Sequence, residues 1–278
     1  GLTASDYFRR WANMPDVRGA YQTTLIASLD EIETALPAEA PVLLSTVYPS
    51  APHDPSIALV EMGIKDRPLG WMDGRLALLW PGQAQDSGID LFVPASTPLH
   101  PTFLNWVDPL TTFETRPTDL DPQFTHYRLR PDAVVKWQAQ NGIPFNAAVE
   151  LLSAEWVTEK VAPGGVAELV TVWRILDPAA VGPVVWPIET TDVVLFAQLL
   201  TDERTVLAQS DRLDAPSWNW QKADILVQVH PIFIPADAPA AKYDVILGIY
   251  DRQSGIRLRQ DDVDLDYAEG PPLLLEER

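Results

Sequence analysis

The stretch ILVQVHPIFIPADAPAAKYDVILGIYDRQSGIRL, residues 225–258, decides the fold class of the second half of the chain. In its first part Ile225 and Val227 fall on one side of the chain, whereas Gln228 and His230 fall on the other. The same alternation returns after the central prolines. A period of two is typical of a β-strand whose two faces meet different surroundings. The stretch therefore predicts consecutive antiparallel strands.

The sequence on the N-terminal side of this stretch continues the pattern. Further strands are predicted at 148–156, 167–176, 193–200 and 205–209, and turn residues separate them. Seven short strands with turns between them are typical of a two-sheet sandwich. The sequence thus predicts an all-β antiparallel, immunoglobulin-like sandwich, with an acidic tail at its C-terminal end.

Tyr243 occupies the point where a long connection enters a strand near the end of the predicted sandwich. This is the position of a tyrosine corner, in which a buried ring anchors the connection and its hydroxyl bonds to nearby backbone. An ordinary core tyrosine is the alternative interpretation.

The first part of the chain has a different pattern. Helical spacing of apolar residues predicts a short helix that carries Tyr7, Phe8 and Trp11 on one face, and then a longer helix over 15–36. The run at 41–47 has the length and continuous apolar character of a strand covered on both faces. Another helix, at 54–62, and strands at 76–80 and 89–93 are predicted after it.

This order of elements predicts a small α/β domain with a mainly parallel sheet. We place this domain at residues 1–108 and a linker or crossing segment, rich in Pro, Asp and Thr, at 109–144. The β-sandwich domain takes residues 145–278.

Composition narrows the possible functions. The chain of 278 residues has a net charge of −19, a hydrophobic content of 46% and no cysteine. A strongly negative field disfavours nucleic acid as a partner and disfavours electrostatic docking on anionic lipid. Two sizeable cores must supply the stability, because no disulfide can form. The sequence has no run of roughly 20 apolar residues that would span a membrane, and no signal peptide opens it, so we expect either a cytoplasmic protein or a piece of a longer one.

Searches for catalytic and metal-binding motifs find no strong match, so the sequence predicts no cofactor and no metal site. His53 and Asp54 suggest half of an acid–base pair, although Asp54 as the cap of a helix begun by Pro55 is the favoured interpretation. Together with Asp73 they define an alternative site of a hydrolase, at the strand ends of the α/β half. Alternate aspartates at 262–266 suggest calcium, but the glycine and glutamate of that motif are missing, and a solvated tail is favoured.

Tryptophan is abundant, with 10 residues, and Trp218 and Trp220 lie in the turn-rich sequence DAPSWNWQKAD. In extended backbone, residues two apart face the same side, so these indoles would form adjacent platforms for sugar rings. Gln221 and Asp224 would then bond to ring hydroxyls. The favoured interpretation, however, is that these rings seal the end of the sandwich.

Several blocks of the chain resemble a known family. They are YFRRWANMPDVRGAYQTTLIASLDEI, PVLLST, HDPSIALV, WMDGRLALLWPG and DLFVPAS in the first half. In the second half the pattern is W-x-x-x-D, a proline-bounded strand, Y-x-x-x-x-G-x-Y-D and a final R-L. The chain resembles the soluble C-terminal region of bacterial membrane glycosyltransferases of the dolichyl-phosphate-mannose–protein mannosyltransferase type. It departs from that pattern at Ala241 and Lys242, where the family usually has Pro-Gly.

The resemblance implies a non-catalytic extracytoplasmic module of a polytopic, lipid-sugar-dependent glycosyltransferase. Its expected partners are the membrane-embedded part of the same polypeptide and a glycan or glycosylated acceptor. Catalysis is then assigned to the parent protein, and the chain is expected on the periplasmic or cell-surface side, tethered by upstream helices. The alternatives are a free-standing secreted carbohydrate-binding or adhesion protein and the hydrolase described above. The upstream coding sequence distinguishes the first two, and turnover of esters and glycosides tests the third.

Overall fold

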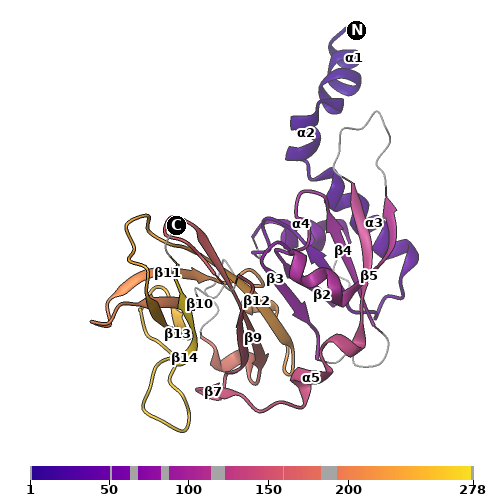
Figure 1. Cartoon of the computed structure of the whole chain (residues 1–278). Helices are drawn as coiled ribbons and strands as arrows, with labels where there is room; N and C mark the ends of the chain where they lie inside the picture. The colour runs from indigo at the N-terminus through magenta and orange to yellow at the C-terminus, as the bar shows by residue number, and fades with distance from the viewer. Residues whose placement is uncertain are drawn as a thin grey trace. The chain divides into compact units, whose positions relative to one another are not determined.

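The structure, a computed structural model, describes residues 2–50, 52–62, 68–82, 88–113, 123–158, 160–182 and 193–276 (Figure 1). The chain forms two compact units. Unit 1 comprises Gly1–Arg75 and Asp86–Pro131, and unit 2 comprises Leu76–Gln85 and Asp132–Arg278. Each unit therefore contains two separate stretches of the chain.

The helices of unit 1 begin with four short turns, α1 (Leu2–Ser5), η1 (Asp6–Arg10), η2 (Trp11–Asn13) and α2 (Pro15–Ala20), which precede α3 (Thr23–Ala35). The single helix predicted over 15–36 is broken, because Gln22 adopts a left-handed conformation with φ of 53° that a right-handed helix cannot continue. Within α3 the buried residues include Leu25, Leu29 and Ile32, as the predicted stripe requires.

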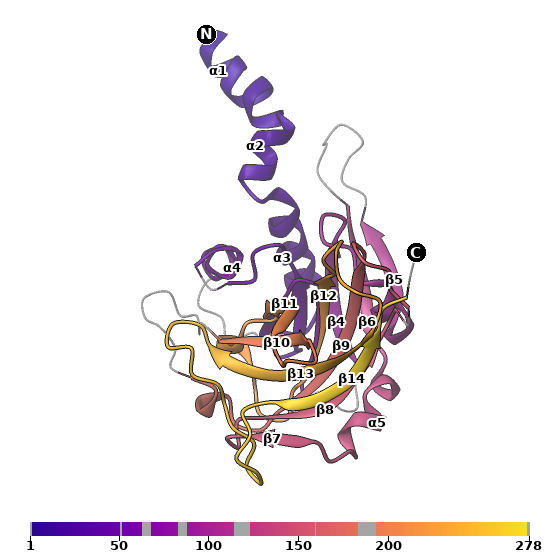
Figure 2. The same cartoon turned by 60° about the vertical axis from the view of Figure 1, so that its left-hand side comes forward.

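Unit 1 has one five-stranded sheet in the order β2-β1-β4-β6-β5. Its strands β4, β6 and β5 are labelled in Figure 2. The strands are β1 (Val42–Ser45), β2 (Leu69–Met72), β4 (Ile89–Pro94), β5 (Val107–Phe113) and β6 (Phe124–Leu129), and helix α4 (Asp54–Glu61) lies between β1 and β2 in sequence. β1 runs parallel to β2 and β4, whereas β6 runs antiparallel to β4 and β5. The sheet is therefore mixed, and the prediction of a mainly parallel sheet is corrected.

The segment 109–144, predicted as a linker, contains regular structure. Most of β5 and all of β6 fall in it, followed by η4 (Pro131–Ala133), α5 (Val135–Gln138) and β7 (Ile143–Phe145), while η3 (Pro101–Trp106) precedes it. Pro109 lies in β5, which is at the edge of the sheet, where fewer backbone groups must pair. The first core consequently extends to Pro131 rather than ending at residue 108.

Unit 2 consists of two antiparallel sheets, in the orders β11-β10-β13-β14 and β3-β12-β9-β8-β7. Six of the seven predicted strands are confirmed, as β8 (Val149–Trp156), β9 (Val166–Ile175), β10 (Val193–Leu200), β11 (Val206–Arg212), β12 (Ile225–Phe233) and β13 (Lys242–Asp251). The seventh, predicted from the alternation at 256–259, is not a strand, because its only ladder contact with the described residues is an isolated bridge between Arg257 and Tyr250. Two short helical turns, η5 (Pro178–Ala180) and η6 (Ser217–Asn219), connect some of them. The second half of the chain is thus mostly antiparallel β-sheet.

β3 (Ala77–Trp80) was assigned to the α/β domain by its position in the sequence, but it pairs antiparallel with β12 in unit 2. β12 consequently lies between β3 and β9, and Gln228 and His230 are fully buried. The chain leaves unit 1 after Arg75 and contributes β3 as the edge strand of the five-stranded sheet of unit 2. It is part of unit 1 again from Asp86.

The acidic tail contains a strand that the sequence did not predict, β14 (Ala268–Leu274), which pairs with β13. It includes Pro271 and Pro272, which an edge strand tolerates because one side of its backbone needs no partner. Asp262 and Asp264 before it are exposed, and Asp264 pairs with Arg259. Over the described residues no group of three or more His, Asp or Glu side chains is arranged to hold a metal ion.

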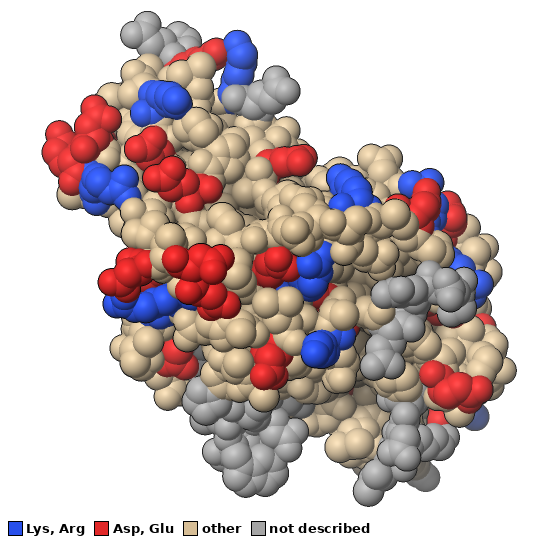
Figure 3. Space-filling view, turned by 90° about the horizontal axis from the view of Figure 1, so that it is seen from below, with Lys and Arg blue, Asp and Glu red and all other residues tan. Residues whose placement is uncertain are grey.

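The tyrosine corner is confirmed. Tyr243 is buried, and its hydroxyl donates a 2.8 Å hydrogen bond to the carbonyl oxygen of Pro239 in the preceding connection. None of the helices that the structure describes combines the length and apolar character that a membrane span requires. On the face drawn in Figure 3, acidic side chains occur in several separate groups rather than in one patch.

Candidate functional site

A cavity of about 210 Å³ lies at the carboxyl ends of β1 and β4 in unit 1. These two strands are parallel neighbours, and β2 pairs with β1 on its other side. After β1 the chain forms β2 on one side of it and β4 on the other, so the strand order reverses between β1 and β4. In sheets with parallel strands, ligands bind outside the carboxyl ends of the strands at such a reversal, which is where this cavity lies. Its lining residues are Gly19, Gln22, Thr23, Thr24, Leu25, Ser45, Thr46, Val47, Tyr48, Asp54, Pro94 and Ser96.

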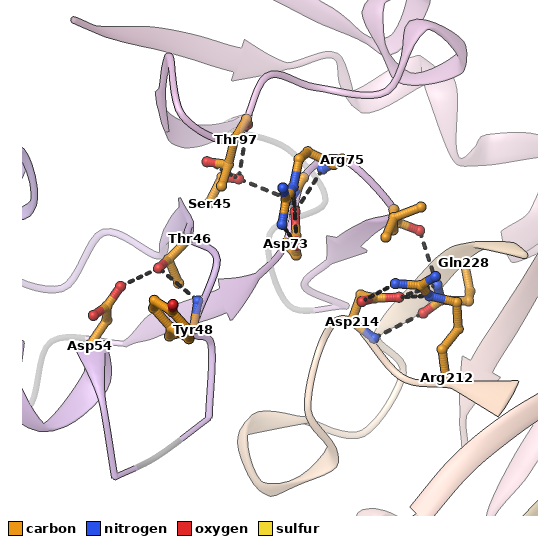
Figure 4. A network of polar contacts seen from close by, with 12 residues as sticks. Ser45, Thr46, Tyr48, Asp54, Asp73, Arg75, Thr97, Arg212, Asp214 and Gln228 are labelled. Atoms are coloured by element: carbon orange, nitrogen blue, oxygen red, sulfur yellow. Dashed lines mark hydrogen bonds and ion pairs between the residues drawn. The ribbon is translucent and has the colours of Figure 1, made fainter. Parts of the chain in front are cut away.

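Asp54 is the charged group of the cavity. It is the first residue of α4 and is buried, and its carboxylate accepts a short hydrogen bond from the Thr46 hydroxyl. Thr46 Oγ1 in turn accepts a 3.1 Å hydrogen bond from the backbone N–H of Tyr48 (Figure 4). The favoured interpretation of Asp54 as the cap of α4 is wrong, because His53 occupies the cap position and the helix begins at Asp54. Its oxygens bond to Thr46 and His53 instead.

His53 holds the outer side of Asp54. Its Nδ1 lies 2.6 Å from Asp54 Oδ1, and its ring centroid is 4.3 Å from that of Tyr48. The His53 side chain is partly exposed and lines an open hollow beside α4 rather than the cavity itself. The predicted pairing of His53 with Asp54 is therefore present, and it fixes both the carboxylate and the Tyr48 ring.

Ser45 ties together the strand ends around the cavity. Its Oγ accepts a 2.9 Å bond from the backbone N–H of Gly74 and lies 2.9 Å from Thr97 Oγ1, to which it donates. Glycine at residue 74 permits this close approach, because a Cβ there would lie 2.7 Å from Ser45 Oγ and displace it. The Ser45 hydroxyl is thus engaged in joining the loops that follow β1, β2 and β4.

Asp73, the third residue of the alternative site, does not join His53 and Asp54. Its carboxylate forms a two-point ion pair with the guanidinium of Arg75, with distances of 2.9 Å and 2.6 Å. It is buried and is not part of the cavity wall. The structure therefore brings together two of the three predicted residues, and Asp73 belongs to a separate ion pair.

The second unit does not present the predicted tryptophan platforms. Trp218 lies in the 3-10 turn η6, and Trp220 follows it with 3% of its surface exposed. The Trp220 Nε1 donates to the carbonyl of Ala215 at 2.9 Å, and the Trp218 Nε1 is buried. The prediction of two adjacent exposed rings is wrong because a 3-10 turn does not send residues two apart to the same side.

Asp224 and Gln221 also have different roles from those predicted. Gln221 is exposed, whereas Asp224 is buried and accepts backbone N–H bonds from Gly82 at 2.9 Å and Gln221 at 2.8 Å. Burial raises the pKa of Asp224 to about 6, although the two backbone bonds act in the opposite direction. Its carboxylate therefore holds the segment after β3 against the loop before β12.

A buried polar cluster in unit 2 surrounds β12. The Gln228 amide nitrogen bonds to Asp214 at 2.7 Å and to the carbonyl of Leu76, and Arg212 pairs with Asp214 (Figure 4). His230 Nε2 lies 3.0 Å from Thr171 Oγ1. Burial, together with the nearby charge of Arg212, lowers the pKa of His230 to about 3, so this imidazole is neutral. The cluster holds strands together and opens onto no described cavity.

The cavity residues Ser45, Thr46 and Tyr48 were not identified from the sequence as functional. The available signal was their position at the end of the buried strand β1 and just after it, where polar residues at a carboxyl end meet those of the neighbouring strand. The hydroxyls of Thr23 and Thr24 carried no such signal, because only the fold brings the start of α3 to this edge.

No protein-family model and no curated protein matches the chain. Among solved structures, it is similar to the CARDB domain of the PF1109 protein from Pyrococcus furiosus in complex with di-metal ions. The identity is 9% and the TM-score 0.29, over 50% of this chain and 96% of that one. The sporulation control protein Spo0M from Bacillus subtilis gives 9% identity and a TM-score of 0.26, over 46% and 49% of the two chains. Similarities this low carry no conclusion about function.

Proposed function

We propose that the chain is a non-catalytic, extracytoplasmic module of a polytopic lipid-sugar-dependent glycosyltransferase, and that unit 1 holds a glycan or glycosylated acceptor in the cavity at β1 and β4. The membrane-embedded part of the same polypeptide is its proposed partner and tether. The residue blocks of the resemblance support this proposal, because PVLLST and HDPSIALV contain the cavity residues Ser45, Thr46 and Asp54.

The chemistry of the cavity is the observation that carries the proposal. Its polar groups are the hydroxyls of Thr23, Thr24, Ser45, Thr46, Tyr48 and Ser96, the side-chain amide of Gln22 and the Asp54 carboxylate. Among the described residues of its wall there is no lysine or arginine, so a phosphate group would meet a negative charge without a counterion. A neutral ligand rich in hydroxyl groups can donate to Asp54 and exchange hydrogen bonds with the threonines and serines.

The size of the cavity limits the ligand to a small ring. At about 210 Å³ it is smaller than the roughly 300–1,000 Å³ typical of sites for drug-sized ligands. Tyr48 adds an aromatic face at its edge, because this side chain is 53% exposed and packs against His53. The apolar face of a sugar ring would stack on Tyr48 while its hydroxyls turn toward Asp54.

Titration of the chain with monosaccharides and short oligosaccharides, followed by NMR, tests this ligand. We expect dissociation constants on the order of millimolar to tens of micromolar for a small site with one aromatic face. Tyr48→Ala and Asp54→Asn should each weaken binding, whereas the matched control Trp218→Ala, in unit 2, should leave it unchanged. An equal response of Tyr48→Ala and the wild-type chain would exclude the cavity as the sugar site.

The parent gene tests the membrane tether separately. A run of membrane helices encoded directly upstream of Gly1 is expected. A complete reading frame without such helices would instead favour a free-standing secreted carbohydrate-binding or adhesion protein.

We also infer that unit 1 is an α/β domain in which the parallel strands β2, β1 and β4 form the ligand-binding edge, and that unit 2 is a sandwich of the immunoglobulin-like type. The Tyr243 hydroxyl bond to Pro239 supports the second inference, since such a corner is common in that architecture. An experimental structure with a different strand order in any of the three sheets would contradict these inferences.

A hydrolase is the second candidate function, and the 2.6 Å contact between His53 Nδ1 and Asp54 Oδ1 favours it. An aspartate bonded to a histidine orients the imidazole as a general base. Turnover of a panel of esters and glycosides, abolished in His53→Ala, would support this function. Equal background rates for the variant and the wild-type chain would exclude it.

A further inference from the structure

The N-terminal helical turns carry large apolar side chains that no part of the described chain covers. We name residues 2–21 the aromatic segment. From residue 3 to residue 16 none of its side chains is buried, and Figures 1 and 2 both show α1 and α2 extending away from the sheet of unit 1. The exposed fractions are 51% for Tyr7, 70% for Phe8, 37% for Trp11, 45% for Met14 and 61% for Tyr21.

The rings of this segment pack on one another rather than into a core. Tyr7 and Trp11 are stacked with their centroids 4.8 Å apart, and Phe8 meets Tyr7 edge-on at 5.0 Å. Trp11 in turn meets Tyr21 edge-on at 6.0 Å. Four aromatic rings thus form one continuous exposed surface along a helical segment. Contiguous exposed apolar surface of this kind typically marks a site that contacts a partner or a membrane.

The charges of the segment differ from those of the rest of the chain. It contains three arginines and two aspartates, whereas the whole chain has 20 Lys and Arg against 39 Asp and Glu. Arg9 and Arg10 lie between Phe8 and Trp11 in sequence, so basic groups flank the apolar face. The strongly acidic remainder is repelled by an anionic lipid surface, and the aromatic segment is the part that such a surface attracts.

We propose that the aromatic segment binds the interface of a lipid bilayer. Tyr and Trp side chains favour the boundary between hydrocarbon and water, because an apolar ring and a polar tip are satisfied at the same depth. Phe8 and Met14 add apolar area, and long arginine side chains reach from that depth to lipid headgroups. This combination fits a lipid surface better than a protein groove, which would cover one narrow stripe of a helix.

The position of the segment gives this binding a consequence for the cavity. Gly19, near its C-terminal end, and Gln22, directly after it, line the cavity beside Val47 and Tyr48, whose side chains are themselves exposed. Docking of the segment therefore brings the mouth of the cavity close to the headgroup layer. A ring held in the cavity would then be the headgroup of a lipid-linked or membrane-bound molecule. This last step rests on the proposed function, whereas the membrane binding itself does not.

Flotation of the full chain with vesicles tests the inference, using zwitterionic lipid alone and zwitterionic lipid mixed with anionic lipid. We expect the wild-type chain to float with both and more strongly with the anionic mixture. The double variant Phe8→Ser/Trp11→Ser should lose roughly tenfold or more of its partitioning, since interfacial binding scales with the apolar area inserted. Arg9→Gln/Arg10→Gln should lose only the additional binding to anionic vesicles.

Leu104→Ser/Leu110→Ser is the matched control, because these two leucines of unit 1 are 50% and 49% exposed but lie outside the segment. It should float like the wild-type chain. The inference is overturned if the wild-type chain stays in solution, or if the Phe8/Trp11 variant floats as well as the control. A dimer in size-exclusion chromatography that only the Phe8/Trp11 variant abolishes, without flotation, would assign the surface to a second copy and also overturn it.

The two experiments, flotation and sugar titration, can reject the membrane-binding inference and the proposed sugar site separately. Phe8 and Trp11 do not line the cavity, so their double variant should bind saccharides like the wild-type chain. Loss of flotation with intact sugar binding would leave the proposed ligand site in place. Intact flotation without sugar binding would reject that site and leave the membrane surface in place.

Discussion

Tyr243 shows how one side chain fixes a long connection. Its ring is buried at the start of β13 and its hydroxyl holds the carbonyl of Pro239. We expect Tyr243→Phe to lower the free energy of unfolding by about 1 kcal/mol, because the Pro239 carbonyl loses its donor. Tyr243→Ala should cost about 3–5 kcal/mol through lost burial and the remaining cavity. Thermal and urea unfolding of both variants measure this, and an unchanged melting temperature for Tyr243→Ala would show that the ring is not anchored.

The buried carboxyl group of Asp224 makes the stability of the folded chain depend on pH. Its pKa is raised from 3.8 to about 6 by burial, so the folded chain retains this proton at pH values where the unfolded chain has lost it. The stabilisation by the protonated group is complete below the unfolded pKa and is lost as the pH rises through the folded pKa.

Relative to Asp224→Asn, the wild-type chain should therefore lose roughly 1–3 kcal/mol of stability between pH 4 and pH 6. Urea unfolding of both proteins across this range measures the difference. Parallel pH profiles would mean that the carboxylate ionises normally in the folded chain.

The elements around the cavity depend on a close approach between strand ends. A Cβ added at Gly74 would lie 2.7 Å from Ser45 Oγ and 2.8 Å from a methyl carbon of Leu99. Gly74→Ala should therefore destabilise the chain by about 1–3 kcal/mol and displace Ser45 from Thr97. Gly19→Ala, in α2, is the control, since its Cβ would meet nothing within 4 Å.

Alanine at position 19 should be neutral or stabilise by up to about 1 kcal/mol, because it favours a helix. Thermal unfolding of the two variants tests the contrast. Equal melting temperatures would show that the loops after β1 and β2 adjust without cost.

The division of the whole molecule depends on β3. A fragment starting at residue 145, the boundary predicted from the sequence, would lack β3 and all of β7 except its last residue. The edge of β12 would then expose unpaired backbone groups beside apolar side chains, which favours aggregation. We expect this fragment to be insoluble or to lack a cooperative unfolding transition, whereas the full chain unfolds cooperatively.

Leu79→Asp in the full chain tests the same contact without truncation. Leu79 is buried in β3 opposite Leu226, so a carboxylate there should cost several kcal/mol, roughly 3–5 by analogy with an unpaired buried charge. A soluble, cooperatively folding fragment together with a stable Leu79→Asp variant would show that unit 2 does not require β3.

The sequence by itself determined the elements whose pattern is local. The alternation in β12 and β13, the buried run of β1 and the stripe of α3 each follow from the spacing of apolar residues along a few turns or pleats. The tyrosine corner was also predictable, because the ring and the backbone that it anchors are four residues apart. The contact of His53 with Asp54 joins adjacent residues, and the sequence suggested it for that reason.

Only the tertiary structure decided which residues from distant segments meet. β3 is buried along its whole length, as β1 is, so its run of apolar residues is the same whichever sheet it joins. Only its backbone pairing with β12 assigns it to unit 2. Trp220 looked exposed because it follows a turn, but packing turned it inward. The cavity needed Thr23, Ser45 and Ser96 from three separate segments. The local spacing of apolar residues indicates which side chains are buried. Pairing between backbone groups far apart in the sequence determines which other residues they pack on.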